Sequence, residues 1–160
     1  MGIHAAADTE YDWPWYGELV GAYFNGHPLD PNVRDAVIRR IDKEHESSSM
    51  LPDDWACKDE WYNYKNLNPN VTVLLNLDES TYEGGTNGEN HPIAWYHEFD
   101  GGRSWYTGLG HTEESFEDPL YLDHLWGGIS YAAGAGVPVD YNRSTAVSYT
   151  HLTLPTKRIV

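Results

Sequence analysis

The segment VTVLLNL, residues 71–77, is apolar at nearly every position. This pattern is typical of a strand buried at the centre of a sheet, because a strand with one wet face alternates between apolar and polar residues. Two aromatic-rich runs follow, IAWYHEF at 93–99 and RSWYTGL at 103–109, and they flank the sequence DGG. That composition predicts a β-hairpin. The chain is therefore expected to build a sheet with a buried central strand and a hairpin near its C-terminus.

Two helices are expected to accompany these strands. Apolar residues spaced at i, i+3, i+4 and i+7 predict a helix over 13–24, with Asp12 as its cap and Pro14 in its first turn. Asp118 and Pro119 are typical of the start of a second helix. Its apolar stripe is expected to consist of Leu122, Leu125, Trp126, Ile129 and Ala133, with Gly134 as the stop.

The remaining segments complete an α/β interpretation. DAVIRRID at 35–42 is ambiguous between helix and strand, and its alternation favours a strand. Residues 47–58 contain serines and a proline and are interpreted as a loop. Strand, helix, strand, hairpin and helix in this order indicate a mixed α/β domain. We expect the domain to cover 1–136 and interpret 137–160, which loses all periodicity, as a non-native or disordered tail.

The charge of the chain limits its partners. A formal net charge of −15 argues against nucleic acid or an anionic membrane as a binding partner. No apolar run approaches the length of a membrane-spanning helix, so membrane insertion is not expected. The one cysteine, Cys57, excludes an intramolecular disulfide framework. Localisation stays open between the cytoplasm and the periplasm or extracellular space, because a secretion signal, if present, would lie upstream of this sequence.

Five stretches of the chain carry a resemblance to a known family. They are GIHAAADTEYDWPWYGELVGAYFNGHP, DEWYNY, VTVLLNLDESTYEGG, HPIAWYHEFDGGRSWYTGLGHTEESF and DPLYLDHLWGGISYA, in that order. Over residues 2–134 the chain resembles the ThuA-like, trehalose-utilisation family. The resemblance implies a flavodoxin-like, class I glutamine-amidotransferase-like fold, which is a three-layer sandwich. It also implies that the first strands of the sheet are missing, so we expect an N-terminally truncated gene fragment.

The resemblance gives two histidines a place. In amidotransferase-like folds the nucleophilic cysteine stands on a sharp turn that follows a strand, and Gly2-Ile3-His4 matches that position. The superfamily ends its triad with His-x-Glu after a late strand, which His111 and Glu113 match. The resemblance therefore implies that His4, His111 and Glu113 are catalytic and meet at the carboxyl edge of the sheet.

The residue types at these positions leave two kinds of chemistry open. A histidine in place of the cysteine cannot form a thioester, so a glutamine amidotransferase is not expected, and Cys57 is interpreted as structural. Two imidazoles near carboxylates suit general acid–base catalysis. They also suit a divalent metal such as zinc, with His4 and His111 as ligands. The candidate carboxylates are Asp8, Glu60 and Glu113.

Substrate-binding residues are expected around the His4 turn. Tyr11 and Trp13 follow it, and flat aromatic faces beside Asp8 and Glu60 suit a sugar ring, although an aromatic residue at such a position more often packs the helix onto the sheet. Arg103 is a candidate for binding an anionic group or a solvated residue at a strand end. The remaining histidines are ranked lower: His27 and His91 precede prolines and are expected to bond to the backbone, and His45 and His124 are expected to be solvated.

The resemblance implies a role in sugar metabolism and does not specify the reaction. A lyase, isomerase or hydrolase acting on a keto-sugar or disaccharide by acid–base or metal-assisted chemistry fits the residues. Two alternatives belong to other classes. One is a non-catalytic carbohydrate-binding or interaction module of a larger secreted protein with additional domains, and the other is a gene fragment without function.

Overall fold

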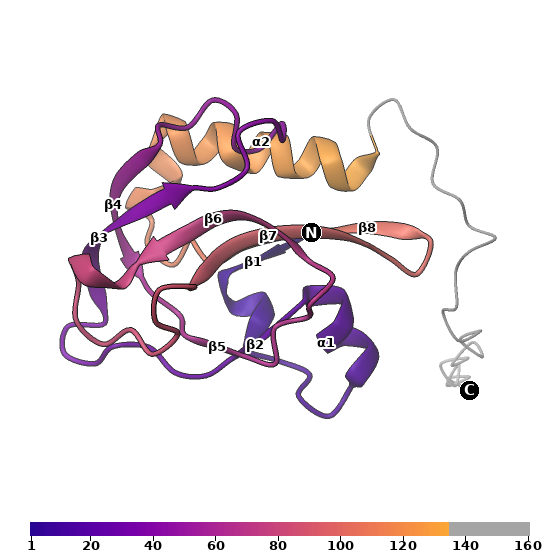
Figure 1. Cartoon of the computed structure of the whole chain (residues 1–160), viewed down its shortest axis with the longest axis horizontal. Helices are drawn as coiled ribbons and strands as arrows, with labels where there is room; N and C mark the ends of the chain where they lie inside the picture. Colours follow the sequence, from indigo (N-terminus) through magenta and orange to yellow (C-terminus); the bar gives the residue numbers. More distant parts are fainter. Residues whose placement is uncertain (135–160) are drawn as a thin grey trace, which may run out of the picture.

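The computed structural model describes residues 1–134, in which a curled six-stranded sheet has a helix on each face (Figure 1). The strands are β1 (Gly2–Ile3), β2 (Tyr23–Phe24), β3 (Val33–Arg40), β4 (Asp54–Glu60), β5 (Tyr64–Lys65), β6 (Thr72–Asp78), β7 (Pro92–Phe99) and β8 (Gly102–Thr107). The helices are α1 (Pro14–Val20) and α2 (Pro119–Ala133), with 3-10 turns η1 (His4–Ala7), η2 (Glu79–Thr81) and η3 (Glu114–Glu117). The predicted mixed α/β fold class is confirmed. The tail predicted for 137–160 lies outside the described residues.

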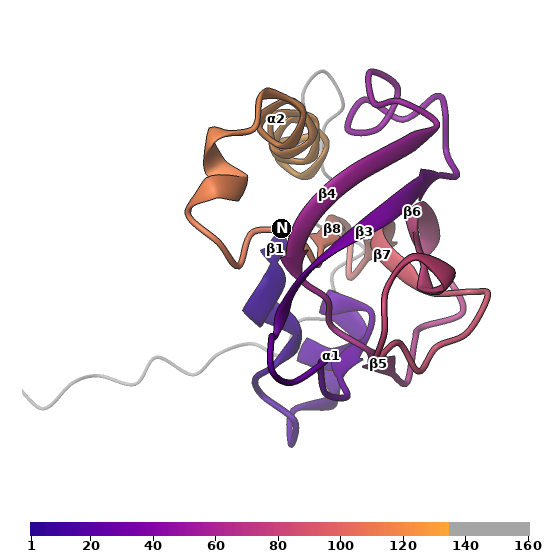
Figure 2. The same ribbon diagram turned by 90° about the vertical axis from the view of Figure 1, so that its left-hand side faces the viewer.

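The sheet is mixed, and its strand order places the first strand beside the last. The order is β1-β8-β7-β6-β3-β4, in which β1 runs parallel to β8 and every other neighbouring pair is antiparallel. Figure 2 shows how the sheet curls, with β4 and β3 turned toward the viewer and α1 and α2 on opposite sides. The short strands β2 and β5 pair separately on the α1 side.

The predicted hairpin is confirmed in β7 and β8. Phe99 pairs with Gly102, so the turn has two central residues, Asp100 and Gly101. Both have positive φ, 50° and 79°, which is the signature of the tight turn that an Asp-Gly pair favours between twisted strands. The predicted central strand is confirmed as β6, where Leu74, Leu75 and Leu77 are each at most 1% exposed. The strand expected at 35–42 is confirmed as β3, which begins and ends two residues earlier than expected.

The loop expected at 47–58 is wrong in its second half, because β4 begins at Asp54. In this strand Trp55 and Asp59 are buried, and the side chains of Ala56 and Lys58 between them are exposed. The alternation is that of a half-buried strand, but the charged residues interrupt its apolar signal. β4 is at the edge of the described sheet, where charged residues are common because they discourage pairing with another chain.

The first helix is shorter than the predicted span of 13–24. It begins after Trp13 rather than Asp12 and ends at Gly21, whose φ of 96° is left-handed and favours glycine. The indole Nε1 of Trp95 donates to the carbonyl of Val20 at 2.8 Å, so a core residue satisfies the end of the helix. Tyr23, predicted as the last helical apolar position, instead belongs to β2.

The second helix has the predicted ends but a different buried face. The Asp118 carboxylate accepts from the backbone N–H of Leu120, and Gly134 ends α2 with a φ of 69°. The buried face is made of Tyr121, His124, Leu125, Gly127 and Gly128, whereas Leu122, Trp126 and Ile129 of the predicted stripe are 45%, 69% and 44% exposed. A Cβ at Gly128 would stand 2.5 Å from the Trp105 ring, so the helix rests on the sheet at this glycine. The expectation that His124 is solvated is also wrong, because it is fully buried.

The core lies on both faces of the β8-β7-β6 part of the sheet. Trp95, Trp105 and Tyr106 are completely buried there, and both α1 and α2 contact β8. This packing fixes β1 against β8 and so positions the residue that follows β1. Among residues 1–134, no helix combines the length and the apolar character that crossing a membrane requires.

Candidate functional site

His4 stands at the turn where β1 passes into η1. Its backbone φ is 42°, in the left-handed region, a conformation that costs a non-glycine residue about 1–3 kcal/mol and that gathers at functional sites. The Tyr106 hydroxyl donates to the His4 carbonyl at 2.8 Å and helps to hold the turn. The sharp turn after a strand is the geometry expected from Gly2-Ile3-His4.

The tautomer of His4 follows from its backbone partner. Its Nδ1 lies 2.9 Å from the carbonyl oxygen of Gly108, which can only accept, so Nδ1 carries the hydrogen. In the neutral ring the lone pair is then on Nε2. That nitrogen lies 3.2 Å from Glu60 Oε2. The ring is therefore oriented by the backbone of the neighbouring strand and turns its free nitrogen toward a carboxylate.

Glu60 is the last residue of β4, and its side chain is only 6% exposed. Asn32 donates to its Oε1 at 2.5 Å, and His4 approaches Oε2. Burial raises the pKa of Glu60, but the hydrogen bond from Asn32, the close approach of His4 Nε2 and the imidazoles of His111 and His27 lower it by a larger amount. The net pKa lies below the usual value, so the site holds a buried carboxylate in its charged form.

His111 reaches the same point from the loop after β8. Its Nδ1 lies 3.2 Å from His4 Nε2 and 3.3 Å from Glu60 Oε2, and its side chain remains 39% exposed. Asp59 holds this loop: its carboxylate accepts from the backbone N–H groups of Gly110 and His111 at 2.7 and 3.1 Å and from the Ser115 hydroxyl at 3.0 Å. Neighbouring residues of β4 thus supply one member of the site and position another.

His4, Glu60 and His111 form what we call the His–Glu–His cluster. Each contributes one atom to a nearly equilateral triangle with sides of 3.2, 3.2 and 3.3 Å. Among the described residues this is the group of histidine, cysteine and carboxylate side chains with the spacing of a metal site. Glu60 Oε2 accepts, and so does His4 Nε2 in the neutral ring, so either a hydrogen on His111 Nδ1 or a bound cation must lie among the three atoms. The arrangement can therefore move a proton or hold a metal.

Two more side chains line the cluster. Tyr62 packs its ring 4.0 Å from that of His4, centroid to centroid, and burial together with the charges of Glu60 and Asp8 raises its pKa to about 12. His27 donates Nδ1–H to the carbonyl of Pro28 at 2.7 Å, as its place before proline predicts. Its Nε2 lies 3.7 Å from Glu60 Oε1, so its ring also faces the site.

The other predicted site residues lie outside the cluster. Asp8 ends η1 and accepts a hydrogen bond from Tyr11, which is 46% exposed. Trp13 is 37% exposed and stacks on Trp15. Glu113 is exposed at the start of η3, two residues beyond His111.

Arg103 lies at the other end of β8. It pairs in register with Glu98 near the hairpin turn, and its charge acts on Tyr131 of α2. Along the strand it is four residues from Thr107, which pairs with Ile3, and this corresponds to about 13 Å. The structure therefore brings together His4, His111 and Glu60 of the predicted residues, keeps Asp8 and Tyr11 within a few residues of His4, and places Arg103 at a distance.

Sequence reasoning missed Asp59 and Asn32 and underrated His27. The period-two burial of β4, with Trp55 and Asp59 on one face, is a signal that could have placed Asp59 inside. No local signal marks Asn32, because it follows a loop and meets Glu60 across 28 residues of sequence.

Comparisons with known proteins agree with this fold. The family profile described as ThuA, trehalose utilisation, matches residues 1–132. A crystal structure of a ThuA-like protein from Bacteroides uniformis superposes with a TM-score of 0.67 at 25% identity, covering 84% of this chain and 58% of that one. One from Parabacteroides merdae gives a TM-score of 0.58 at 20% identity, covering 82% and 59%. This chain thus spans less than two thirds of the length of these solved relatives. No functionally curated protein matches the chain.

Proposed function

The chain belongs to the ThuA, trehalose-utilisation family, and from that premise we propose that the His–Glu–His cluster is a divalent-metal site that acts on a carbohydrate. The carbohydrate substrate is inferred from the description of the family, and the metal chemistry is inferred from the cluster. The proposed class is a lyase, isomerase or hydrolase working on a keto-sugar or disaccharide.

The observation that carries the proposal is the triangle of ligand atoms. A tetrahedral zinc ion with bonds of about 2.0–2.1 Å has its ligand atoms about 3.3 Å apart. The three sides of the cluster are 3.2, 3.2 and 3.3 Å. Two imidazole nitrogens and one carboxylate oxygen are a ligand set that zinc accepts, with a fourth position left for water or substrate.

The surroundings of the triangle support the same interpretation. The backbone carbonyl of Gly108 fixes the tautomer of His4, and such second partners are typical of histidines that bind metals. The lowered pKa of Glu60 keeps the carboxylate charged and ready to bind a cation. Cys57 is unsuited to a nucleophilic role, because burial followed by the charges of Asp59 and Asp118 raises the pKa of its thiol.

Each residue has a proposed task in the reaction. A bound metal ion would polarise a sugar carbonyl or lower the pKa of a bound water. His4 and Glu60 are the fixed, buried ligands, and the partly exposed His111 closes the triangle on the solvent side. His27, whose Nε2 faces Glu60, is placed to accept a proton near the cluster, and Asp8 and Tyr11 are placed to bond sugar hydroxyls at its rim.

A metal-free acid–base site is the second candidate. It is favoured by His111 Nδ1, which lies within hydrogen-bond distance of both His4 Nε2 and Glu60 Oε2 and can share one proton with them. In this alternative His111 is the group that exchanges protons with the substrate, because its side chain is the exposed one.

Equilibrium dialysis against zinc at neutral pH separates the two candidates. We expect one zinc per chain, lost in His111→Ala and retained in Glu117→Gln, a matched exposed control on η3. Turnover of trehalose and of a keto-disaccharide, followed by NMR, should then depend on zinc and fail with a chelator. Turnover that survives the chelator would favour acid–base chemistry, and zinc bound equally by His111→Ala would refute the metal site.

A further inference from the structure

A second polar hollow lies on the α1 side of the sheet, away from the His–Glu–His cluster. It measures about 570 Å³, is open to solvent, and is lined by α1, the loop after β5 and the end of β7. We call it the α1 hollow, and the residues used below are Glu18, Tyr23, Asn66, Asn70, His97 and Phe99. Its volume falls in the range of about 300–1,000 Å³ that small-molecule sites occupy.

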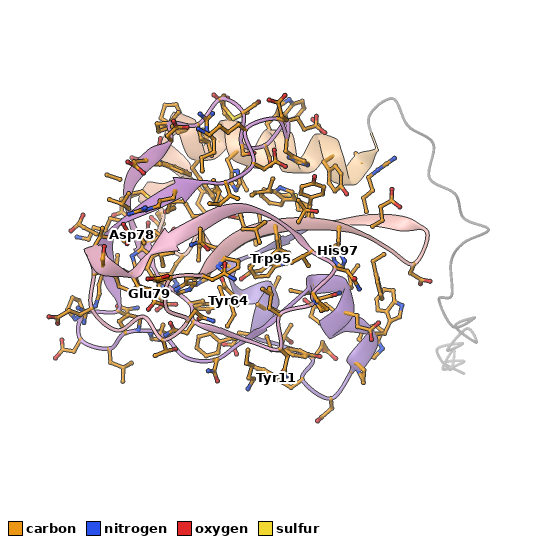
Figure 3. The ribbon with its side chains drawn as sticks, in the orientation of Figure 1. Tyr11, Tyr64, Asp78, Glu79, Trp95 and His97 are labelled. Carbon is orange, nitrogen blue, oxygen red and sulfur yellow. The ribbon has the colours of Figure 1, made fainter. Side chains whose placement is uncertain are left out.

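The hollow presents hydrogen-bonding groups that the protein does not use. Within residues 1–134, the side chains of Glu18, Asn66 and Asn70 have no hydrogen-bond partner. His97 donates Nε2–H to the carbonyl of Leu19 at 3.0 Å, which leaves Nδ1 as an acceptor on a ring that lines the hollow. Figure 3 shows His97 between the hairpin and α1. Amide donors, a carboxylate and an imidazole acceptor together match the mixed donors and acceptors of vicinal hydroxyls.

Rings held in place by their neighbours supply the apolar part. Tyr23 stacks on Tyr11 at 5.3 Å between centroids, and Phe99 packs against Trp15 at 5.5 Å. Both Tyr23 and Phe99 line the hollow. Fixed aromatic faces beside amides and carboxylates are the surface that the C–H faces and hydroxyls of a sugar ring require.

The charge of the lining disfavours anionic ligands. Neither lysine nor arginine lines the hollow, and its two charged residues, Glu18 and Glu98, are both acidic. A phosphate or carboxylate would meet repulsion without a compensating cation. A neutral polyhydroxylated ligand meets no such cost.

The hollow is separate from the cluster but connected to it by residues on the surface. Gly108 N bonds to the carbonyl of Ile93 near His4, and His97 is four residues further along β7, about 13 Å away. Tyr11, labelled in Figure 3 below α1, stacks on Tyr23 and also bonds to Asp8, which follows the His4 turn. A ring surface thus leads from the rim of the cluster to the hollow.

We propose that the α1 hollow is a second binding site, which takes a neutral carbohydrate independently of the His–Glu–His cluster. It binds through the amides of Asn66 and Asn70, the Glu18 carboxylate and the rings of Tyr23 and Phe99. This site goes beyond the proposed metal chemistry, because a sugar can occupy it whether or not the cluster holds a metal.

The test is a titration of the isotopically labelled chain with trehalose, followed by amide chemical shifts. Trehalose should shift the amide signals of Glu18, Asn68, Asn70 and His97 in a saturable manner. The double variant Glu18→Ala/Asn70→Ala, which alters two exposed side chains, should weaken trehalose binding at least tenfold. Glu83→Ala, an exposed acidic residue outside the lining, serves as the matched control and should bind normally.

Variants of the two sites distinguish the two proposals. His111→Ala should lose zinc and keep the shifts at the hollow, whereas Glu18→Ala/Asn70→Ala should keep zinc and lose them. Trehalose shifts that are absent, or confined to His4, Glu60 and His111, would overturn the hollow and leave the metal site standing. Unchanged trehalose affinity in the double variant would overturn it as well.

Discussion

Two buried histidines on opposite faces of the sheet show how differently the same side chain is used. His4, on the α1 side, and His124, on α2, are 5% and 0% exposed. Each has its Nδ1 on a backbone carbonyl, that of Gly108 for His4 and that of Ser47 for His124, at 2.9 and 2.6 Å. They differ at the other nitrogen.

The second nitrogen decides what each histidine can do. Nε2 of His124 lies 3.2 Å from the Thr107 hydroxyl, which can donate to it, so every polar atom of that ring has a suitable partner. Nε2 of His4 faces Glu60 and His111, which are acceptors or share a proton with it. Burial alone therefore says little about function. A histidine with two ordinary partners stabilises the fold, and one whose free nitrogen faces a carboxylate is a candidate for chemistry.

The largest expected effect is on metal binding at the His4 side. Changes to residues that only orient metal ligands typically weaken affinity 10–100-fold, so removing a ligand with His111→Ala should weaken zinc binding by more than about 100-fold. Because His111 is partly exposed, the thermal unfolding midpoint of the metal-free His111→Ala variant should change little. Calorimetric titration with zinc measures the affinity. If the zinc dissociation constant of His111→Ala is unchanged, the His4 side of the sheet does not bind metal and its difference from the His124 side is not supported.

His124→Ala should have the opposite effect: it should lower stability and leave zinc affinity unchanged. The change leaves a cavity against Trp105 and an unpaired carbonyl on Ser47, which should lower the free energy of unfolding by about 2–4 kcal/mol. Zinc affinity should not change. Urea denaturation gives the stability, and the same zinc titration gives the control. A large loss of zinc binding in a variant that remains folded would contradict the purely structural role.

The stability of the α2 layer should fall in acid. Burial lowers the pKa of His124 to about 4, although the Ser47 carbonyl acts in the opposite direction, and the unfolded value is 6.5. The unfolded chain then binds the extra proton between pH 6.5 and 4, so stability falls as pH decreases through that window. The shift corresponds to about 3 kcal/mol. Burial also lowers the pKa of His45 and His91, so the urea midpoints of His124→Ala should keep a smaller slope across this range than those of the unaltered chain. An unchanged slope would contradict a neutral, buried His124.

Asp59→Asn should have a smaller effect on the His4 side. The amide keeps the size of the carboxylate but weakens its bonds to the backbone of Gly110 and His111, so His111 is held less well. For such a positioning residue we expect zinc affinity to fall about tenfold. Asp35→Asn, on the exposed face of β3, is the control. Equal zinc affinity in both variants would show that Asp59 does not position the site.

The parts of the fold that could be predicted from sequence are those with local signals. Asp100 and Gly101 marked the hairpin, and Asp118 marked the start of α2, because a tight turn and a helix cap depend on residues close in sequence. β4 was missed because charged residues interrupt its apolar pattern in the sequence. The alternation became clear only from the burial of Trp55 and Asp59 in the structure. The buried face of α2 was only partly predicted: Leu125 is buried as expected, but Gly128 rather than an apolar side chain makes the contact with Trp105.

The candidate site was only partly predictable. His4 and His111 are 107 residues apart, and family resemblance rather than any spacing suggested them as a pair. In the structure Glu60 contacts both histidines, whereas Glu113 is exposed. Glu60 reaches them because β4 ends beside the His4 turn, and this depends on the tertiary fold. Asn32 acts through a long-range hydrogen bond for which the sequence contains no pattern, and Asp59 was overlooked because the alternation of β4 is interrupted by charged residues.

The metal site is tested most directly by an anomalous-difference map of the zinc-loaded protein at the zinc absorption edge. One strong peak is expected about 2.0–2.2 Å from His4 Nε2, His111 Nδ1 and a Glu60 carboxylate oxygen, and none beside His124. A map without a peak among these three atoms, in crystals that take up zinc elsewhere, would contradict the proposed metal site.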